Sequence, residues 1–180
     1  SLPVYLVKDW NATFSLNFTT AQNKKLNTKD LYFEPTLSEN NGSQVLSMKL
    51  KTSENTYLEY IYTLPKEGYM LNLVVRSQGL AGAVNTSEPM NIDWKLQARR
   101  MEKSVTYENR YTQAAIQYEG DRINRMSQTG NDEQKEEKVS WVAYKQHLFT
   151  SVLISDNPFE KGNFISHNIA MNEGKEVKYT

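Results

Sequence analysis

Few residues in this chain could carry chemistry. His147 and His167 are the only histidines, and there is no cysteine, so disulfides and thiolate metal sites are excluded. A metal site needs several ligands brought together, and neither histidine stands in an HxH or HExxH spacing. We therefore expect each histidine to be structural or to face solvent. A Ser-His-Asp triad stays open because triads assemble from distant positions, although the GxSxG elbow is absent.

Like the histidines, the acidic residues and the glycines do not identify a catalytic or phosphate-binding site. A glycosidase needs a pair of carboxylates, but no spacing selects a pair from the available acids. These acids are Asp93, Glu102, Glu108, Glu119 and Asp121. The segment Gly79-Leu80-Ala81-Gly82 lacks the Lys-Ser/Thr of a phosphate-binding loop and is expected to be a loop between strands.

The three tryptophans could form a sugar-binding platform. Trp94 alternates with Ile92 and Leu96, so core packing is expected. Trp141 lies in a segment that is apolar on both faces and is also expected to be buried. Only Trp10, which has polar neighbours on both sides, is expected to be exposed.

The elements that would position these residues are predicted to be strands. Apolar side chains alternate with polar ones, as expected when successive side chains leave opposite faces of a sheet. The clearest runs are Phe14–Phe18, Leu46–Leu50, Leu58–Leu64 and Ile92–Ala98. Short strands at regular spacing, without a long amphipathic helix, predict an all-β antiparallel sandwich.

Other segments complete this expected order. Asn40–Ser43 and Pro65–Gly68 are typical of hairpin turns, Lys145–Phe149 could form one helical turn, and the charged run Asp132–Lys138 is expected to be a solvated loop. Further strands are expected at Val4–Lys8, Leu31–Glu34, Tyr69–Arg76, Ser104–Glu108, Tyr111–Tyr118, Val139–Tyr144, Thr150–Ser155, Asn163–Ala170 and Glu176–Thr180.

Composition narrows the class of protein. The 180 residues include 38% hydrophobic and 23% charged residues, a globular balance, and the formal net charge is zero. A nucleic-acid-binding protein usually has a basic excess, which is missing here. No segment approaches the ~20 apolar residues needed to span a bilayer. The chain starts and stops without obvious natural ends, so we expect an excised fragment.

Three segments resemble one family in the family's order. Tyr57–Tyr69 resembles its strand, short basic-Gly turn and returning strand, and Tyr111–Tyr118 follows. Val139–Ile154, with Trp-Val-Ala and then Gln-x-x-Phe, resembles the segment near the end of the periplasmic domain of YidC-type membrane protein insertases. The Asn-, Thr- and Tyr-rich composition resembles a Bacteroidetes-type member.

The resemblance implies a fold and a setting. The fold is an antiparallel twisted β-supersandwich, similar to galactose-mutarotase-like proteins, with little helix. Residues 1–180 are expected to form a single, C-terminally truncated domain at the periplasmic face of the bacterial inner membrane. The family inserts and folds membrane proteins, alone or with the Sec translocon. Its hydrophilic groove belongs to a membrane core that is absent here.

The expected role is therefore a non-catalytic accessory domain that contacts Sec translocon components and nascent membrane proteins. No catalytic, cofactor-binding or metal residue is assigned, no cofactor is implied, and the interaction surface is left unknown. Fold similarity alone does not transfer mutarotase activity. Two alternatives remain open: a secreted or surface carbohydrate-binding β-sandwich module, and a structural spacer for the membrane core.

Overall fold

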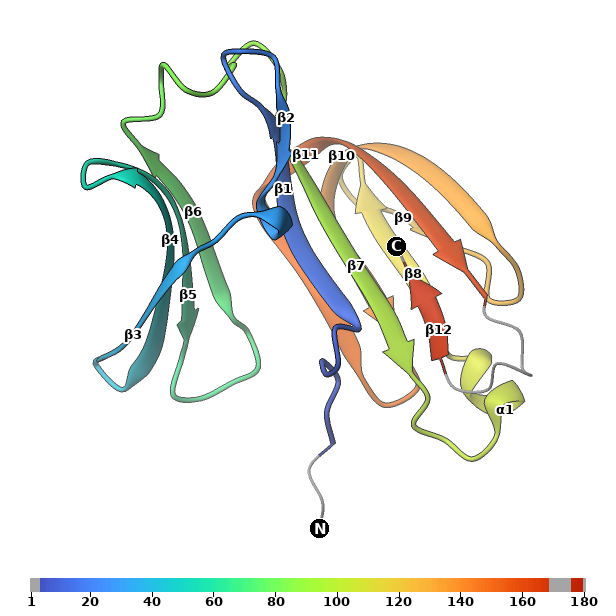
Figure 1. Cartoon of the computed structure of the whole chain (residues 1–180). Helices are drawn as coiled ribbons and strands as arrows, with labels where there is room; N and C mark the ends of the chain where they lie inside the picture. Colours follow the sequence, from blue (N-terminus) through green and yellow to red (C-terminus); the bar gives the residue numbers. More distant parts are fainter. Residues whose placement is uncertain (1–3, 169–175, 180) are drawn as a thin grey trace. The chain divides into compact units, whose positions relative to one another are not determined.

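The computed structural model describes residues 4–168 and 176–179. The chain divides into two compact units. The first unit combines residues 1–13 with 94–180, and the second unit comprises residues 14–93. Both are built from antiparallel strands, which confirms the predicted all-β class (Figure 1).

The second unit contains a four-stranded antiparallel sheet in the order β3-β4-β5-β6, so β3 and β6 are its edges. Strand β1 pairs antiparallel with the short β2, which leads into a 3-10 helix at Thr28–Asp30. The strands are β1 (Ala12–Thr19), β2 (Lys25–Asn27), β3 (Glu34–Asn40), β4 (Ser43–Ser53), β5 (Thr56–Leu64) and β6 (Asn72–Gln78).

Period-two alternation builds the core of the second unit. Leu16 on β1 is buried with Leu58 and Tyr60 on β5, and all three belong to the sets predicted to line one face. A polar contact lies inside this core, where Thr28 Oγ1 accepts from Leu16 N at 2.9 Å and lies 2.9 Å from Tyr60 Oη. Burial raises the pKa of Tyr60, so this hydroxyl stays protonated as a hydrogen-bonding group.

The turn between β3 and β4 has the geometry its sequence predicts. Asn41 and Gly42 have φ of 48° and 78°. Positive φ at both central residues is typical of the turn type that matches the twist of a two-residue hairpin. The Asn-Gly pair tolerates this conformation because asparagine and glycine enter the left-handed region at low cost.

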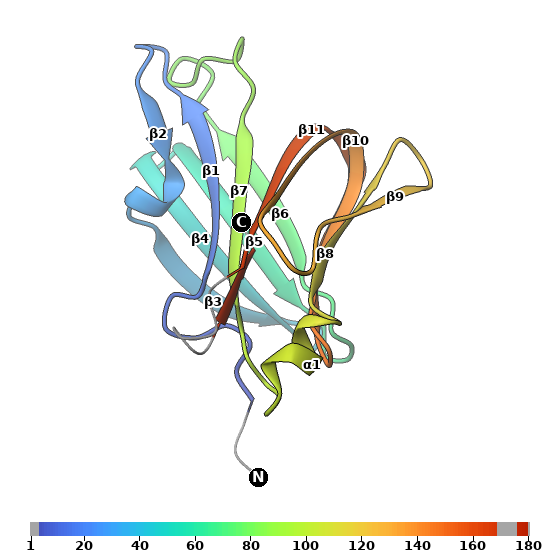
Figure 2. The ribbon, with the colours of Figure 1, turned by 90° about the vertical axis from the view of Figure 1, so that its right-hand side faces the viewer.

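The first unit is an antiparallel sheet in the order β7-β12-β11-β10-β8-β9. The strands β10 and β11 pair along most of their length, and Figure 2 shows them as two long, curved neighbours. The elements are β7 (Asn91–Arg99), α1 (Val105–Asn109), β8 (Gln113–Tyr118), β9 (Arg122–Arg125), β10 (Asp132–Lys145), β11 (Thr150–His167) and β12 (Glu176–Tyr179).

The core of the first unit lies on one face of these strands. Ile116 on β8 and Val139 on β10 are almost completely buried. Trp94 is partly buried against this cluster and stacks on Tyr144 with ring centroids 4.3 Å apart. The predicted packing role of Trp94 is confirmed. Trp141 is only half-buried, short of the full burial that its apolar neighbours predict.

Two sequence predictions in the first unit are wrong for local reasons. Ser104–Glu108 does not form a strand; residues from Val105 form the helix α1 because the Ser104 hydroxyl caps it. The charged run Asp132–Lys138 is not a loop but the first half of β10. Its backbone pairs with β11, while every second side chain faces solvent, so a strand satisfies both the hydrogen bonds and the charges.

Smaller differences concern the segments between strands. Val4–Lys8 and most of Leu31–Glu34 are not strands. The helical turn expected at Lys145–Phe149 does not form, because Lys145 ends β10 and residues 146–149 make a tight connection to β11. The two strands predicted between Thr150 and Ala170 form one continuous strand, β11, and the end of that range lies outside the described residues. In the described part of the chain, no helix is long and apolar enough to cross a membrane.

Candidate interaction sites

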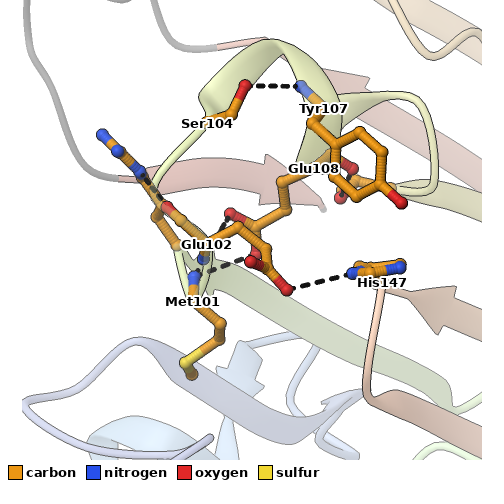
Figure 3. A network of polar contacts seen from close by, with 8 residues as sticks. Met101, Glu102, Ser104, Tyr107, Glu108 and His147 are labelled. Atoms are coloured by element: carbon orange, nitrogen blue, oxygen red, sulfur yellow. Dashed lines mark hydrogen bonds and ion pairs between the residues drawn. The ribbon is translucent and has the colours of Figure 1, made fainter.

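A polar network surrounds the helix α1 (Figure 3). The Ser104 hydroxyl accepts a hydrogen bond from Tyr107 N at 3.2 Å, which satisfies one of the free N–H groups at the helix start. Glu108, near the other end, is 5% exposed and points back toward the strand end that precedes the helix. A five-residue helix is too short to be stable alone, so these contacts fix it to the sheet.

Glu108 accepts hydrogen bonds from two backbone groups. Its carboxylate lies 2.9 Å from Met101 N and 3.2 Å from Glu102 N. A buried carboxylate is costly unless donors compensate for the lost water, and the two amides do so here. Glu108 therefore holds the turn between β7 and α1 in place.

His147 lies beside an acid and two aromatic rings. Its Nδ1 is 3.1 Å from Glu102 Oε1. The imidazole packs at 4.6 Å from the ring centroid of Tyr111 and at 5.3 Å, edge to face, from that of Tyr107. From the sequence alone His147 had no identifiable partner; the structure supplies Glu102 from 45 residues away.

The cluster combines a carboxylate, an imidazole and two phenol rings, and the side chains of His147 and Glu102 are 26% and 31% exposed. A histidine beside a carboxylate can exchange protons in principle. Here the two tyrosine rings pack directly on the imidazole, and the carboxylate joins it to the turn before α1. Within residues 4–168 and 176–179, no group of three potential metal ligands is present. The contacts therefore tie α1 to the β10–β11 connection.

The other candidate acids do not join the cluster. Glu119 pairs with Arg122 at 2.7 Å across the turn between β8 and β9, and Asp121 is exposed in the same turn. Asp93 lies on β7. His167 is exposed at the end of β11. The sequence analysis thus named three members of the network, Glu102, Glu108 and His147, but no sequence signal joins them.

Trp10 is exposed as predicted, with 98% of its surface accessible, and it adopts a positive φ of 62°. The loop that carries it is held by the neighbouring Asn11, which is buried. The Asn11 amide donates to Leu6 O and Gln97 O. These hydrogen bonds hold the loop that presents the apolar ring of Trp10 to solvent.

A second apolar surface lies at the β6 edge of the four-stranded sheet, and we call it the β6 edge. Val74 and Val75 are 54% and 38% exposed. They leave opposite faces of the strand, and the preceding residues Tyr69, Met70 and Leu71 are also exposed. The sequence predicts a strand here but does not show that it is an edge strand, because edge status depends on sheet order.

The charge on the β6 edge is already paired. Arg76 is the only charged residue of β6, and its Nε donates to the carboxylate of Glu59 on β5. Hydrogen bonding to Glu59, together with its negative charge, raises the pKa of Arg76. The exposed side chains of β6 thus include Val74 and Val75, and its one cation is paired with Glu59.

The opposite edge, β3, has a different chemistry. It contains Glu34, Pro35 and Glu39. Proline cannot donate to a sheet ladder, and charged residues on an edge discourage further pairing. Protein sheets commonly protect their edges in this way, so the contrast distinguishes the two edges of one sheet.

Comparison with known proteins identifies relatives over nearly the whole chain. The family model for the YidC periplasmic domain matches residues 2–179. Proteins named membrane protein insertase YidC are 35% identical over 163 residues in Bacteroides fragilis and 33% identical over 171 residues in Porphyromonas gingivalis. These matches cover 88% and 93% of this chain, but 25% and 27% of the relatives.

The same name belongs to a relative from Parabacteroides distasonis that is 30% identical over 178 residues, or 98% of this chain and 28% of its own length. The chain thus spans about a quarter of the length of these relatives. No solved structure matches it. The family description places such domains on the periplasmic side of the bacterial inner membrane. The match over residues 2–179 shows that this chain belongs to the YidC periplasmic domain family.

Proposed function

We propose that this chain is a non-catalytic accessory domain of an inner-membrane protein insertase and that it supports the insertion and folding of membrane proteins through protein–protein contacts. Its partners are Sec translocon components and nascent membrane proteins. The observation that carries this proposal is the family match over residues 2–179, together with relatives named membrane protein insertase YidC.

The exposed surfaces support a contact role. The β6 edge and Trp10 present apolar side chains to solvent, whereas the His147–Glu102 pair packs against two tyrosine rings and is only partly exposed. Exposed apolar groups of this kind are typical of surfaces that bind other chains. Fold analogy to sugar-converting enzymes adds no activity, because activity depends on a site and not on a fold.

The test uses the full-length parent protein. Cells depleted of their own insertase are supplied with the intact parent or with a parent lacking the residues equivalent to Val4–Thr180. The amounts of parent and of newly inserted membrane proteins are measured after a short radioactive pulse. We expect slower insertion by the deleted parent at equal parent abundance.

A contact role also predicts neighbours that can be captured. A photo-crosslinking amino acid at Val74 of the full-length parent should give cross-links to nascent chains or translocon subunits. Normal insertion without these residues, together with no specific cross-link from Val74 or Trp10, would contradict the proposal. That result would favour a spacer that only covers and orients the membrane core.

A further inference from the structure

We infer that the β6 edge binds an extended, apolar polypeptide segment as an added strand of the four-stranded sheet. This inference rests on the proposed function and names the chemistry of the partner: an unfolded segment with apolar side chains on both of its faces. It also names the place of contact, which neither the family match nor the relatives' names provide.

Sheet order supplies the first argument. The order β3-β4-β5-β6 leaves the outer side of β6 without a neighbouring strand in the described part of the chain. Across the described residues, no backbone hydrogen bond beyond the pairing with β5 involves residues 72–78. An unpaired strand edge presents alternating N–H and C=O groups, which specify an extended backbone as the partner.

The inner side of β6 is firmly fixed, so the edge is preformed. Seven residues of β6 pair in register with β5, from Asn72 opposite Thr63 to Gln78 opposite Tyr57. Tyr57 Oη also donates to the Gln78 side chain at 2.8 Å. A segment that binds here joins an ordered strand, so only the segment itself loses conformational freedom.

Side chains on both faces of the edge favour an apolar occupant. Val74 lies opposite Ile61 on one face of the sheet, and Val75 lies opposite Tyr60 on the other. Both valines are partly exposed, and an added strand would place its own side chains beside them. Leu71 extends the apolar surface at the start of β6. An occupant with apolar residues at successive positions therefore covers exposed surface on both faces.

Charge disfavours an acidic occupant. Arg76 is the only cation on β6, and its guanidinium is engaged by Glu59. The β3 edge is a poor alternative because Pro35 lacks a backbone donor and Glu34 and Glu39 add charge. The two edges of this sheet thus form a natural pair of test site and control site.

The experiment uses the chain of residues 1–180 and a fluorescent ten-residue peptide in which three pairs of valines are separated by single threonines, with a lysine at each end, so that valines lie on both faces of the extended peptide. A matched peptide carries prolines at alternate positions, so it cannot complete a ladder of hydrogen bonds. Fluorescence anisotropy measures binding, and hydrogen exchange followed by mass spectrometry measures protection with and without saturating peptide. We expect binding of the first peptide only, with slower exchange confined to residues 72–78.

Matched variants test the place of contact. Val74→Lys should weaken binding of the peptide by about tenfold or more, because lysine on an edge opposes strand addition. Leu37→Lys places the same charge on the β3 edge, where Leu37 is 70% exposed, and should leave affinity within about twofold. Val74→Thr keeps the branched shape and should bind far better than Val74→Lys. Circular dichroism confirms that each variant is folded.

Three results would overturn the inference. The first is no protection of residues 72–78 at saturating peptide, and the second is equal weakening by Leu37→Lys. The third is protection of residues 72–78 that grows with protein concentration in the absence of peptide, since this would show that a second copy of the chain covers the edge. A parent whose insertion depends on residues 4–180 but whose β6 edge binds no peptide would retain the proposed function and lose only this inference.

Discussion

Arg76 on β6 donates from Nε to the carboxylate of Glu59, the residue directly opposite it on β5. Ser47 Oγ donates to the other carboxylate oxygen of Glu59, Oε1, at 2.5 Å. Lys49 Nζ lies 3.7 Å from the same oxygen. Burial by itself raises the pKa of Glu59, but the hydrogen bonds and the two cations outweigh it, so this pKa lies below its ordinary value. The pairing joins three neighbouring strands across one face of the sheet.

Loss of the Glu59 charge should destabilise the sheet modestly. Glu59→Gln keeps the size of the side chain but weakens the contacts with Arg76 and Lys49. Both cations are partly exposed, so water screens the loss, and we expect the free energy of unfolding to fall by about 1 kcal/mol. Urea denaturation followed by circular dichroism measures it. Glu39→Gln on the exposed β3 edge is the control, and an equal effect of both changes would contradict the prediction.

The same carboxylate should contribute to acid destabilisation. Because the pKa of Glu59 is lower in the folded than in the unfolded chain, its stabilisation is complete above the unfolded value. This stabilisation is lost as the pH falls below about 4.3 and through the folded pKa. Urea titrations at a series of acidic pH values should therefore show a shallower fall in stability for Glu59→Gln than for the unchanged chain. Parallel curves for the two proteins would exclude this contribution.

The fold was largely predictable because its signals are local. Alternation on β5 places Leu58 and Tyr60 on the core side, and the Asn41-Gly42 pair sets the β3–β4 turn. The two wrong predictions of secondary structure, for Ser104–Glu108 and Asp132–Lys138, have causes that alternation and charge do not reveal. The Ser104 hydroxyl caps the helix α1, which forms where a strand was expected. The charged run Asp132–Lys138 was expected to be a loop, but pairing with β11 makes it part of a strand.

The candidate sites were less predictable because they depend on tertiary structure. Glu102 and His147 are far apart in the sequence, so their contact follows from the strand order and not from a motif. The free edge at Val74 likewise follows from the position of β6 at the end of its sheet. Trp10 is the exception, since its polar neighbours already predict the exposure that is observed.

The loop after β6 should depend on one of its two glycines. Gly79 has a φ of 68°, and a Cβ there would lie 2.6 Å from the backbone oxygen of Asn55. A Cβ at Gly82 would have no heavy atom within 4 Å. Because backbone cannot move aside cheaply, we expect Gly79→Ala to cost about 2 kcal/mol or more and Gly82→Ala less than about 0.5 kcal/mol. Thermal and urea unfolding measure both. Similar stabilities for the two variants would show that the loop readily adjusts.

The turn before α1 should depend on the buried carboxylate of Glu108. Glu108→Ala removes the acceptor for the N–H groups of Met101 and Glu102. A buried donor without an acceptor costs roughly 1–3 kcal/mol, so the free energy of unfolding should fall by about that amount. Glu133→Ala is the control, because Glu133 is half-exposed and pairs with Lys135 at a distance of 3.7 Å.

Hydrogen exchange separates this local role from a general loss of stability. In Glu108→Ala the amides of Met101 and Glu102 should exchange faster than those of the β8 core around Ile116. Glu108→Gln retains one acceptor oxygen and should lie between the alanine variant and the unchanged chain in both stability and exchange. If Glu108→Ala leaves the exchange of these two amides unchanged, water replaces the carboxylate. The turn would then be held by the Ser104 cap and by the packing of Tyr107 and Tyr111 on His147.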